Sequence, residues 1–103
     1  MQKEFTVSNL EEFENMIRVK DFRIAQAVVE TILQNLNTKK KRLHVLSVNL
    51  LDNSTTLDIT LETKYFVDSL KENLKHYIRE EHYEGCIEIE NAVKYLTEKE
   101  SYL

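Results

Sequence analysis

The chain of 103 residues is 42% hydrophobic and 31% charged, with one glycine, one cysteine and no proline. This length fits a single domain over residues 1–103, and the composition excludes collagen-like, linker-like and disordered chains and glycine-rich phosphate loops. The 14 basic and 18 acidic residues give a net charge of −4, so the whole molecule is not expected to attract nucleic acid or an anionic membrane.

Cysteine usage predicts a reducing environment, because the single Cys86 cannot form an internal disulfide. Residues 1–10 carry Glu4 and lack the apolar core of a signal peptide, and no apolar run is long enough to span a bilayer. We therefore expect a cytoplasmic protein without a membrane segment, and nothing in the composition implies a cofactor.

Residues 9–36 have the pattern of a helical hairpin. Ser8 or Asn9 can cap a first helix, and Asp21 can cap a second, so the turn is expected near Val19 to Asp21. The apolar positions of the first helix are Leu10, Phe13, Met16 and Ile17. The single apolar stripe of the second is formed by Phe22, Ala25, Val28, Val29, Ile32, Leu33 and Leu36.

Residues 43–63 alternate with a period of two, which predicts a β-hairpin. The apolar positions are Leu46, Val48 and Leu50 in one strand and Leu57, Ile59 and Leu61 in the other. The segment 51–55 has turn chemistry, because Asp, Asn and Ser side chains bond their own backbone. Two strands alone are marginal in water, so the sheet needs a third strand from residues 1–8 or a second copy of the chain.

Residues 65–96 show the pattern of a second helical hairpin, with a polar corner at residues 79–82. The two apolar stripes are Phe66, Leu70, Leu74, Tyr77 and Ile78, then Tyr83, Cys86, Ile87, Ile89, Ala92, Val93 and Leu96. Gly85 lies inside the second helix, where glycine costs about 1 kcal/mol relative to alanine, so a close neighbour is expected there. The tail 97–103 is expected to fray.

The two helical parts align when the chain is shifted by 61 positions. Arg18 then matches Arg79, and Phe22 matches Tyr83, so each copy shows a helix, a polar corner, an aromatic residue and an apolar stripe. Any two antiparallel helical hairpins can look alike at this level, so a true repeat and a chance likeness both stay open.

The second hairpin carries Leu70, Leu74, the run Tyr83-Glu84-Gly85-Cys86-Ile87-Glu88-Ile89, Val93 and Leu96. This segment, about a quarter of the chain, resembles the UVR motif of excision-repair nuclease subunits and of Clp-protease regulators. The motif reads aromatic-Glu-any-small-small-any-aliphatic, from which Ile87 departs by its size, and Glu90-Asn91 replaces its Arg-Asp pair. The resemblance implies a protein–protein docking module rather than a catalytic one.

Acidic residues gather on the last predicted helix and its corner, at Glu80, Glu81, Glu84, Glu88 and Glu90. Such a face can simply keep a helix solvated. It can also bind a basic partner, with charge setting the rate and specificity of binding. These five glutamates are the predicted partner-binding residues.

The dense basic cluster is Lys39-Lys40-Lys41-Arg42. It stands where a helix C-terminus is expected and where the helix dipole favours cations. It can also bind phosphate, which gives an alternative function as a small nucleic-acid-associated protein. No aromatic residue is interleaved with the cluster to stack on bases.

His82 and Cys86 are four residues apart and could hold a metal with Glu80 or Glu84, which gives a second alternative, a small metal-binding protein. Cys86 can instead fill a small slot in the core, with His82 capping the corner. A Cys–His nucleophile pair is not expected, because the neighbouring glutamates disfavour a thiolate.

The sequence thus predicts an α+β fold in which two helical hairpins flank a small antiparallel β-sheet. The predicted function is a non-enzymatic protein–protein interaction or regulatory module, which acts through the acidic helical face and forms a homodimer. Pairing of basic and acidic regions and pairing of open strand edges are the two routes to self-association. Small chains rich in Lys, Glu and Asn with this hairpin also resemble accessory proteins of large bacteriophages.

Overall fold

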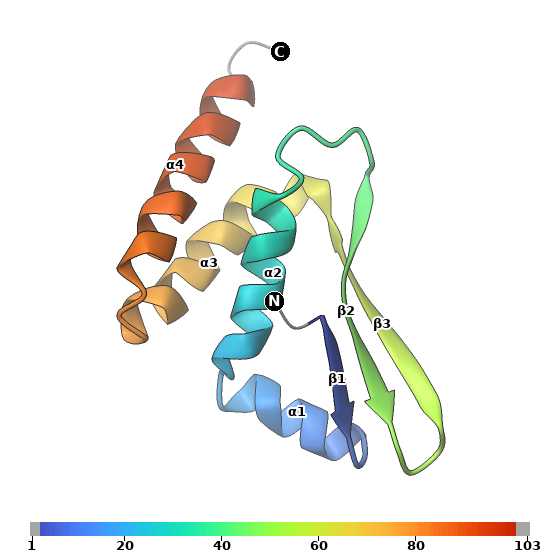
Figure 1. The fold of residues 1–103 in the computed structure, drawn as a ribbon. Helices are drawn as coiled ribbons and strands as arrows, with labels where there is room; N and C mark the ends of the chain where they lie inside the picture. The colour runs from blue at the N-terminus through green and yellow to red at the C-terminus, as the bar shows by residue number, and fades with distance from the viewer. Residues whose placement is uncertain (1–2, 101–103) are drawn as a thin grey trace.

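Residues 3–100, which the computed structural model describes, form four α-helices and a three-stranded mixed sheet (Figure 1). The fold is α+β, as predicted. The elements in chain order are β1 (Glu4–Val7), α1 (Leu10–Arg18), α2 (Phe22–Leu33), β2 (Arg42–Leu50), β3 (Thr55–Glu62), the 3-10 turn η1 (Thr63–Tyr65), α3 (Phe66–Arg79) and α4 (Tyr83–Glu100).

The sheet has the strand order β1-β2-β3, and its first pair is parallel. The predicted β-hairpin is confirmed, because β2 and β3 pair antiparallel, and residues 4–7 supply the third strand. The prediction of an antiparallel sheet is wrong for β1, which places Phe5 beside Val48 in a parallel register. The cause is the connection: α1 and α2 carry the chain back to the end of the sheet where β1 began, and such a crossover makes neighbouring strands parallel.

The strands keep the predicted alternation, with one irregularity. Leu46, Val48 and Leu50 are buried, and Asp58 and Thr60 face the opposite, open side of the sheet. A register shift between His44 and Leu46 lets adjacent residues of β2 both enter the core. The side of the sheet that faces the helices is therefore more apolar than strict alternation predicts.

Helix α2 is buried on two sides, which a single apolar stripe did not predict. Ala27 packs in the cluster between α2 and the sheet, whereas Val29 and Ile32 pack in the cluster shared with α3 and α4. All three side chains are buried. The core therefore has two layers with α2 between them (Figure 1).

Helices α1 and α2 share a corner but do not lie along each other, so the first helical hairpin is only partly confirmed. Figure 1 shows α1 running from the lower end of β1 to the start of α2, at a steep angle to both. Phe13 of α1 packs against Phe5 and Val7 of β1. Leu10 and Ile17 are exposed, contrary to the predicted stripe. The reason is that α1 has only nine residues and packs on one side against the short strand β1.

Helices α3 and α4 do pack as a hairpin, and α4 extends beyond the predicted end. The shared core includes Leu70, Tyr77, Cys86, Ile89, Ala92 and Leu96. Ile78, Tyr83 and Ile87 are exposed, so their predicted place in the core is wrong. Helix α4 includes residues 97–100 of the tail, and residues 101–103 lie outside the described part of the chain.

The two helical corners repeat in detail. Lys20 and Glu81 both adopt the left-handed conformation, with φ of 57° and 55°, and they are 61 positions apart. Asp21 N donates to Met16 O at 3.0 Å, and His82 N donates to Tyr77 O at 2.9 Å, which closes the same C-terminal motif in each. The two corners therefore share the same local geometry, while the helix packing around them differs.

Candidate functional site

The five glutamates predicted to bind a partner are all exposed. Glu80 and Glu81 lie in the corner before α4, and the other three lie on α4 itself. Glu80 Oε1 is 3.4 Å from Arg79 Nη2, so part of its charge is balanced locally. Glu84 and Glu88 are one helical turn apart and share one side of α4.

Two large apolar side chains lie beside these carboxylates on the outer side of α4. Tyr83 is 64% exposed and Ile87 is 59% exposed, one helical turn apart. We refer to Tyr83, Glu84, Ile87, Glu88 and Glu90 as the outer α4 surface. The sequence contains a pattern that predicts this surface. On a helical projection, positions 83 and 87 lie on the side opposite the buried positions 89, 92 and 96.

A groove adjoins this surface between the end of α2 and α4. It has a volume of about 390 Å³ and is lined by Leu33, Leu36, Glu88, Asn91, Ala92 and Tyr95. The Tyr95 hydroxyl donates to Asn37 Oδ1 at 2.5 Å, which fixes one end of the groove. Because Glu88 belongs to both, the outer α4 surface and the groove form one continuous region with apolar and acidic parts.

The residues of the metal alternative build the α3–α4 corner instead. His82 Nδ1 accepts a hydrogen bond from Gly85 N at 3.1 Å, so it caps α4. The His82 ring lies edge-on to Tyr77, with centroids 5.2 Å apart, and Cys86 is buried in the core. Among residues 3–100, no three His, Cys, Asp or Glu side chains gather to hold a metal ion.

Burial and the charges of Glu30 and Glu88 raise the pKa of Tyr77 to about 12. In the unfolded chain the phenol ionises near its ordinary value of 10.0, so the unfolded state binds fewer protons between pH 10 and 12. Stability is therefore expected to fall as pH rises through this interval, and Tyr77→Phe is expected to reduce that fall. Urea unfolding at several alkaline pH values measures it. An identical decline in both proteins would contradict the burial of this phenol.

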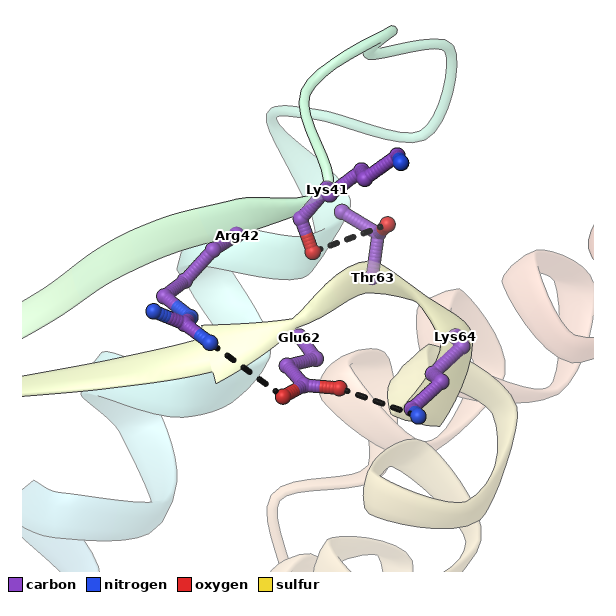
Figure 2. A pocket seen from close by; sticks show the side chains of 5 residues that line it. All are labelled: Lys41, Arg42, Glu62, Thr63 and Lys64. Atoms are coloured by element: carbon purple, nitrogen blue, oxygen red, sulfur yellow. Dashed lines mark hydrogen bonds and ion pairs between the residues drawn. The ribbon is translucent and has the colours of Figure 1, made fainter.

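The predicted basic cluster lies at the open end of the β-hairpin, where Lys41 O accepts a hydrogen bond from Thr63 N at the start of η1. Because α2 ends at Leu33, the cluster does not cap it, and that interpretation is wrong. Figure 2 shows the pocket of about 550 Å³ that Lys41 and Arg42 help to line. Its other lining residues are Glu62, Thr63 and Lys64.

Glu62 holds two cations of the pocket in place (Figure 2). Arg42 Nη2 and Lys64 Nζ each lie 3.3 Å from one of its carboxylate oxygens. Lys64 first, and then Arg42, lowers the pKa of Glu62. One carboxylate between two cations leaves the pocket with excess positive charge, which Lys41 increases.

An exposed aromatic residue stands next to this pocket, which the basic run by itself did not predict. Tyr65 is 47% exposed, and Lys64 Nζ lies 5.1 Å from the centre of its ring. The turn η1 brings Tyr65 to the basic cluster from a later part of the chain. The surface therefore combines cations with a ring that can stack.

The open side of the sheet holds a Ser–His–Asp group that sequence reasoning did not single out. Ser47 Oγ donates to Asp58 Oδ1 at 2.8 Å and lies 2.9 Å from His44 Nε2. A hydroxyl has one proton, so His44 donates to Ser47 rather than accepting from it. This polarity is the reverse of an activated nucleophile, whose proton points to the base.

Comparisons with protein families, with curated proteins and with solved structures find no match for this chain. Within residues 3–100, no helix has both the length and the apolar character needed to cross a bilayer.

Proposed function

We propose that the chain is a non-enzymatic protein–protein interaction or regulatory module that binds a basic partner through the outer α4 surface. The observation that carries this proposal is the exposure of Tyr83 and Ile87 between the carboxylates of α4. A solvated helical face needs no large apolar side chains, so charge for solubility alone does not account for them.

The arrangement matches the anatomy of a binding surface. Apolar anchors at the centre of an interface supply most of the binding energy, and charges around them set specificity and association rate. Here Tyr83 and Ile87 are the anchors, and Glu84, Glu88 and Glu90 surround them. The groove lined by Leu33 and Leu36 can take a further apolar side chain of the partner.

The partner is therefore a segment with apolar residues on one side and lysine or arginine on the other. A docking role agrees with the resemblance of the α3–α4 hairpin to the UVR motif, which stays a prediction. A phage-type accessory role, a cytoplasmic location and self-association as a homodimer remain part of the proposal.

The test uses an amphipathic helical peptide with leucine on one face and lysine on the other. Glu88→Lys is expected to weaken its binding about tenfold, because a cation replaces a carboxylate beside the anchors. Glu14→Lys on α1 makes the same charge change at another exposed site and is expected to leave affinity nearly unchanged. Fluorescence anisotropy of the labelled peptide measures both, and circular dichroism checks that both variants fold.

Equal loss of affinity in the two variants would show that only total charge matters. Unchanged affinity in Glu88→Lys would remove the outer α4 surface as the binding site.

A second candidate function is supported by the pocket at Lys41, Arg42 and Lys64. We propose that it binds single-stranded nucleic acid, with phosphates against the cations and a base on Tyr65. Single-strand binding proteins combine a basic groove with aromatic rings in this way. The closeness of Tyr65 to Lys64 is the observation that favours this function over a purely ionic contact.

A single-stranded DNA oligonucleotide and inorganic polyphosphate are the two probes for this candidate. Lys64→Glu is expected to weaken binding of both, whereas Tyr65→Ala is expected to weaken the oligonucleotide alone. Lys94→Glu on α4 is the matched control, because Lys94 is exposed and distant in sequence from the pocket. Absence of oligonucleotide binding at low salt would end this candidate.

A further inference from the structure

Strand β3 is an edge strand. It pairs with β2 on one side, and among residues 3–100 no strand pairs with its other side (Figure 1). It is eight residues long, and from Thr55 to Glu62 it contains no proline and no lysine. Natural sheets commonly protect an open edge with proline, with lysine or with an irregularity in the edge strand. In this sheet the irregularity lies in β2 and not in the edge strand β3.

The backbone groups of β3 alternate between β2 and the open edge. Thr63 N donates to Lys41 O at 2.9 Å across the hairpin. Backbone groups along an antiparallel strand point alternately to either side, so residues 57, 59 and 61 face β2. The N–H and C=O groups of Thr56, Asp58, Thr60 and Glu62 therefore point to the open edge.

The helix-facing side of β3 is also incompletely covered. Leu57, Ile59 and Leu61 are only half-buried, whereas the equivalent apolar residues of β2 are buried. The edge thus offers unpaired backbone groups and apolar surface together, which is the combination that strand addition uses.

We propose that β3 pairs with β3 of a second copy of this chain, antiparallel about a two-fold axis at Ile59, to give one continuous six-stranded sheet. In this register Asp58 faces Thr60 of the second copy, and Thr56 faces Glu62. Leu57 faces Leu61, and the two Ile59 side chains meet at the axis.

This register satisfies three requirements at once. It places apolar residues opposite apolar residues on the helix-facing side, and polar residues opposite polar residues on the open side. It pairs the outward backbone groups of Asp58 with those of Thr60. It also places no like charges opposite each other. If the two-fold axis moved from Ile59 to Asp58, the two Asp58 side chains would face each other, and if it moved to Thr60, Asp58 would face Glu62.

Hydrogen exchange of the backbone amides tests the pairing directly. In the monomer at low concentration, residues 57, 59 and 61 are expected to exchange slowly and residues 56, 58, 60 and 62 quickly. In the dimer both groups are expected to be protected. An alternating pattern that persists at about 1 mM chain, where even weak complexes form, would overturn the proposal.

Charge variants at position 60 test the register. Thr60→Glu places a glutamate opposite Asp58 of the second copy, twice in each dimer. We expect this variant to weaken the dimer about tenfold, as measured by sedimentation velocity. Asp58→Lys combined with Thr60→Glu is expected to restore it, because each pair then has opposite charges. Thr6→Glu, on the same open side but on β1, is the matched control and should leave the dimer unchanged.

Failure of the double variant to restore the dimer would overturn this register. The inference rests on the self-association that the proposed function includes, and it gives the interface for it. It is separable from docking at the outer α4 surface, because these variants lie on β3 and not on α4. Thr60→Glu is expected to bind the leucine-lysine peptide as the native chain does, so loss of one property without the other identifies which proposal has failed.

Discussion

Replacing Gly85 with alanine is expected to lower the free energy of unfolding by about 1–3 kcal/mol, although alanine is the better helix former. A Cβ at this position would approach Cδ2 and Cε2 of Tyr77 more closely than real Cβ atoms do, and it would lie 2.7 Å from His82 Nδ1. Tyr77 is 3% exposed, and its ring packs against Phe22 with centroids 4.9 Å apart, so it cannot move aside freely. Overpacking therefore outweighs the gain in helix propensity.

Urea unfolding of Gly85→Ala measures this effect. Asn91→Ala is the control, because Asn91 is exposed on the same helix and alanine there gains propensity without a clash. A stabilisation of Gly85→Ala equal to that of the control would contradict the close contact between Tyr77 and Gly85.

Leu70→Ala is expected to cost about 2–5 kcal/mol, the range for deleting a large side chain from a packed core. Leu70 is fully buried on α3, where it packs with residues of α2 and α4. Ile78 lies on the same helix and in the same sequence pattern, yet it is 56% exposed. Ile78→Ala is therefore expected to change stability by less than about 0.5 kcal/mol.

The denaturant midpoints of the two variants show whether the structure or the sequence pattern predicts their stability correctly. The apolar periodicity treats Leu70 and Ile78 alike, so similar losses in both variants would support the pattern and contradict the structure.

Local signals in the sequence predicted the elements well. The period of two located β2 and β3, because one side of this sheet is buried and the other is open. Asn9 and Asp21 cap α1 and α2 as expected, with side-chain oxygens that accept from Glu12 N and Arg23 N. The close neighbour expected at Gly85 is Tyr77.

Features that depend on tertiary contacts could not be predicted from periodicity. The parallel pairing of β1 depends on where α1 and α2 return the chain, and the two-sided burial of α2 depends on what packs on each side. Ile78, Tyr83 and Ile87 fit a helical stripe within the tolerance of the pattern, and only the position of the neighbouring helix shows that they face solvent.

The candidate sites divide in the same way. The glutamates of α4 and the basic run are visible in the sequence, because charge clusters are local features. The helical periodicity places Tyr83 and Ile87 in the core, so it does not reveal the apolar centre of the acidic surface. Lys64 and Tyr65 join the basic cluster only through the return of β3 beside β2, which no local pattern contains.

The double variant Tyr83→Ser with Ile87→Ser tests the outer α4 surface most directly, with amide chemical shifts recorded during titration with the leucine-lysine peptide. The native chain is expected to show shifts centred on residues 83–90 and the groove beside them. The double variant, with an unchanged melting temperature, is expected to lose at least about tenfold in affinity, because apolar anchors carry most of the binding energy. Equal affinity in both proteins, with shifts spread over acidic residues of α1 as well as α4, would contradict the proposed binding surface.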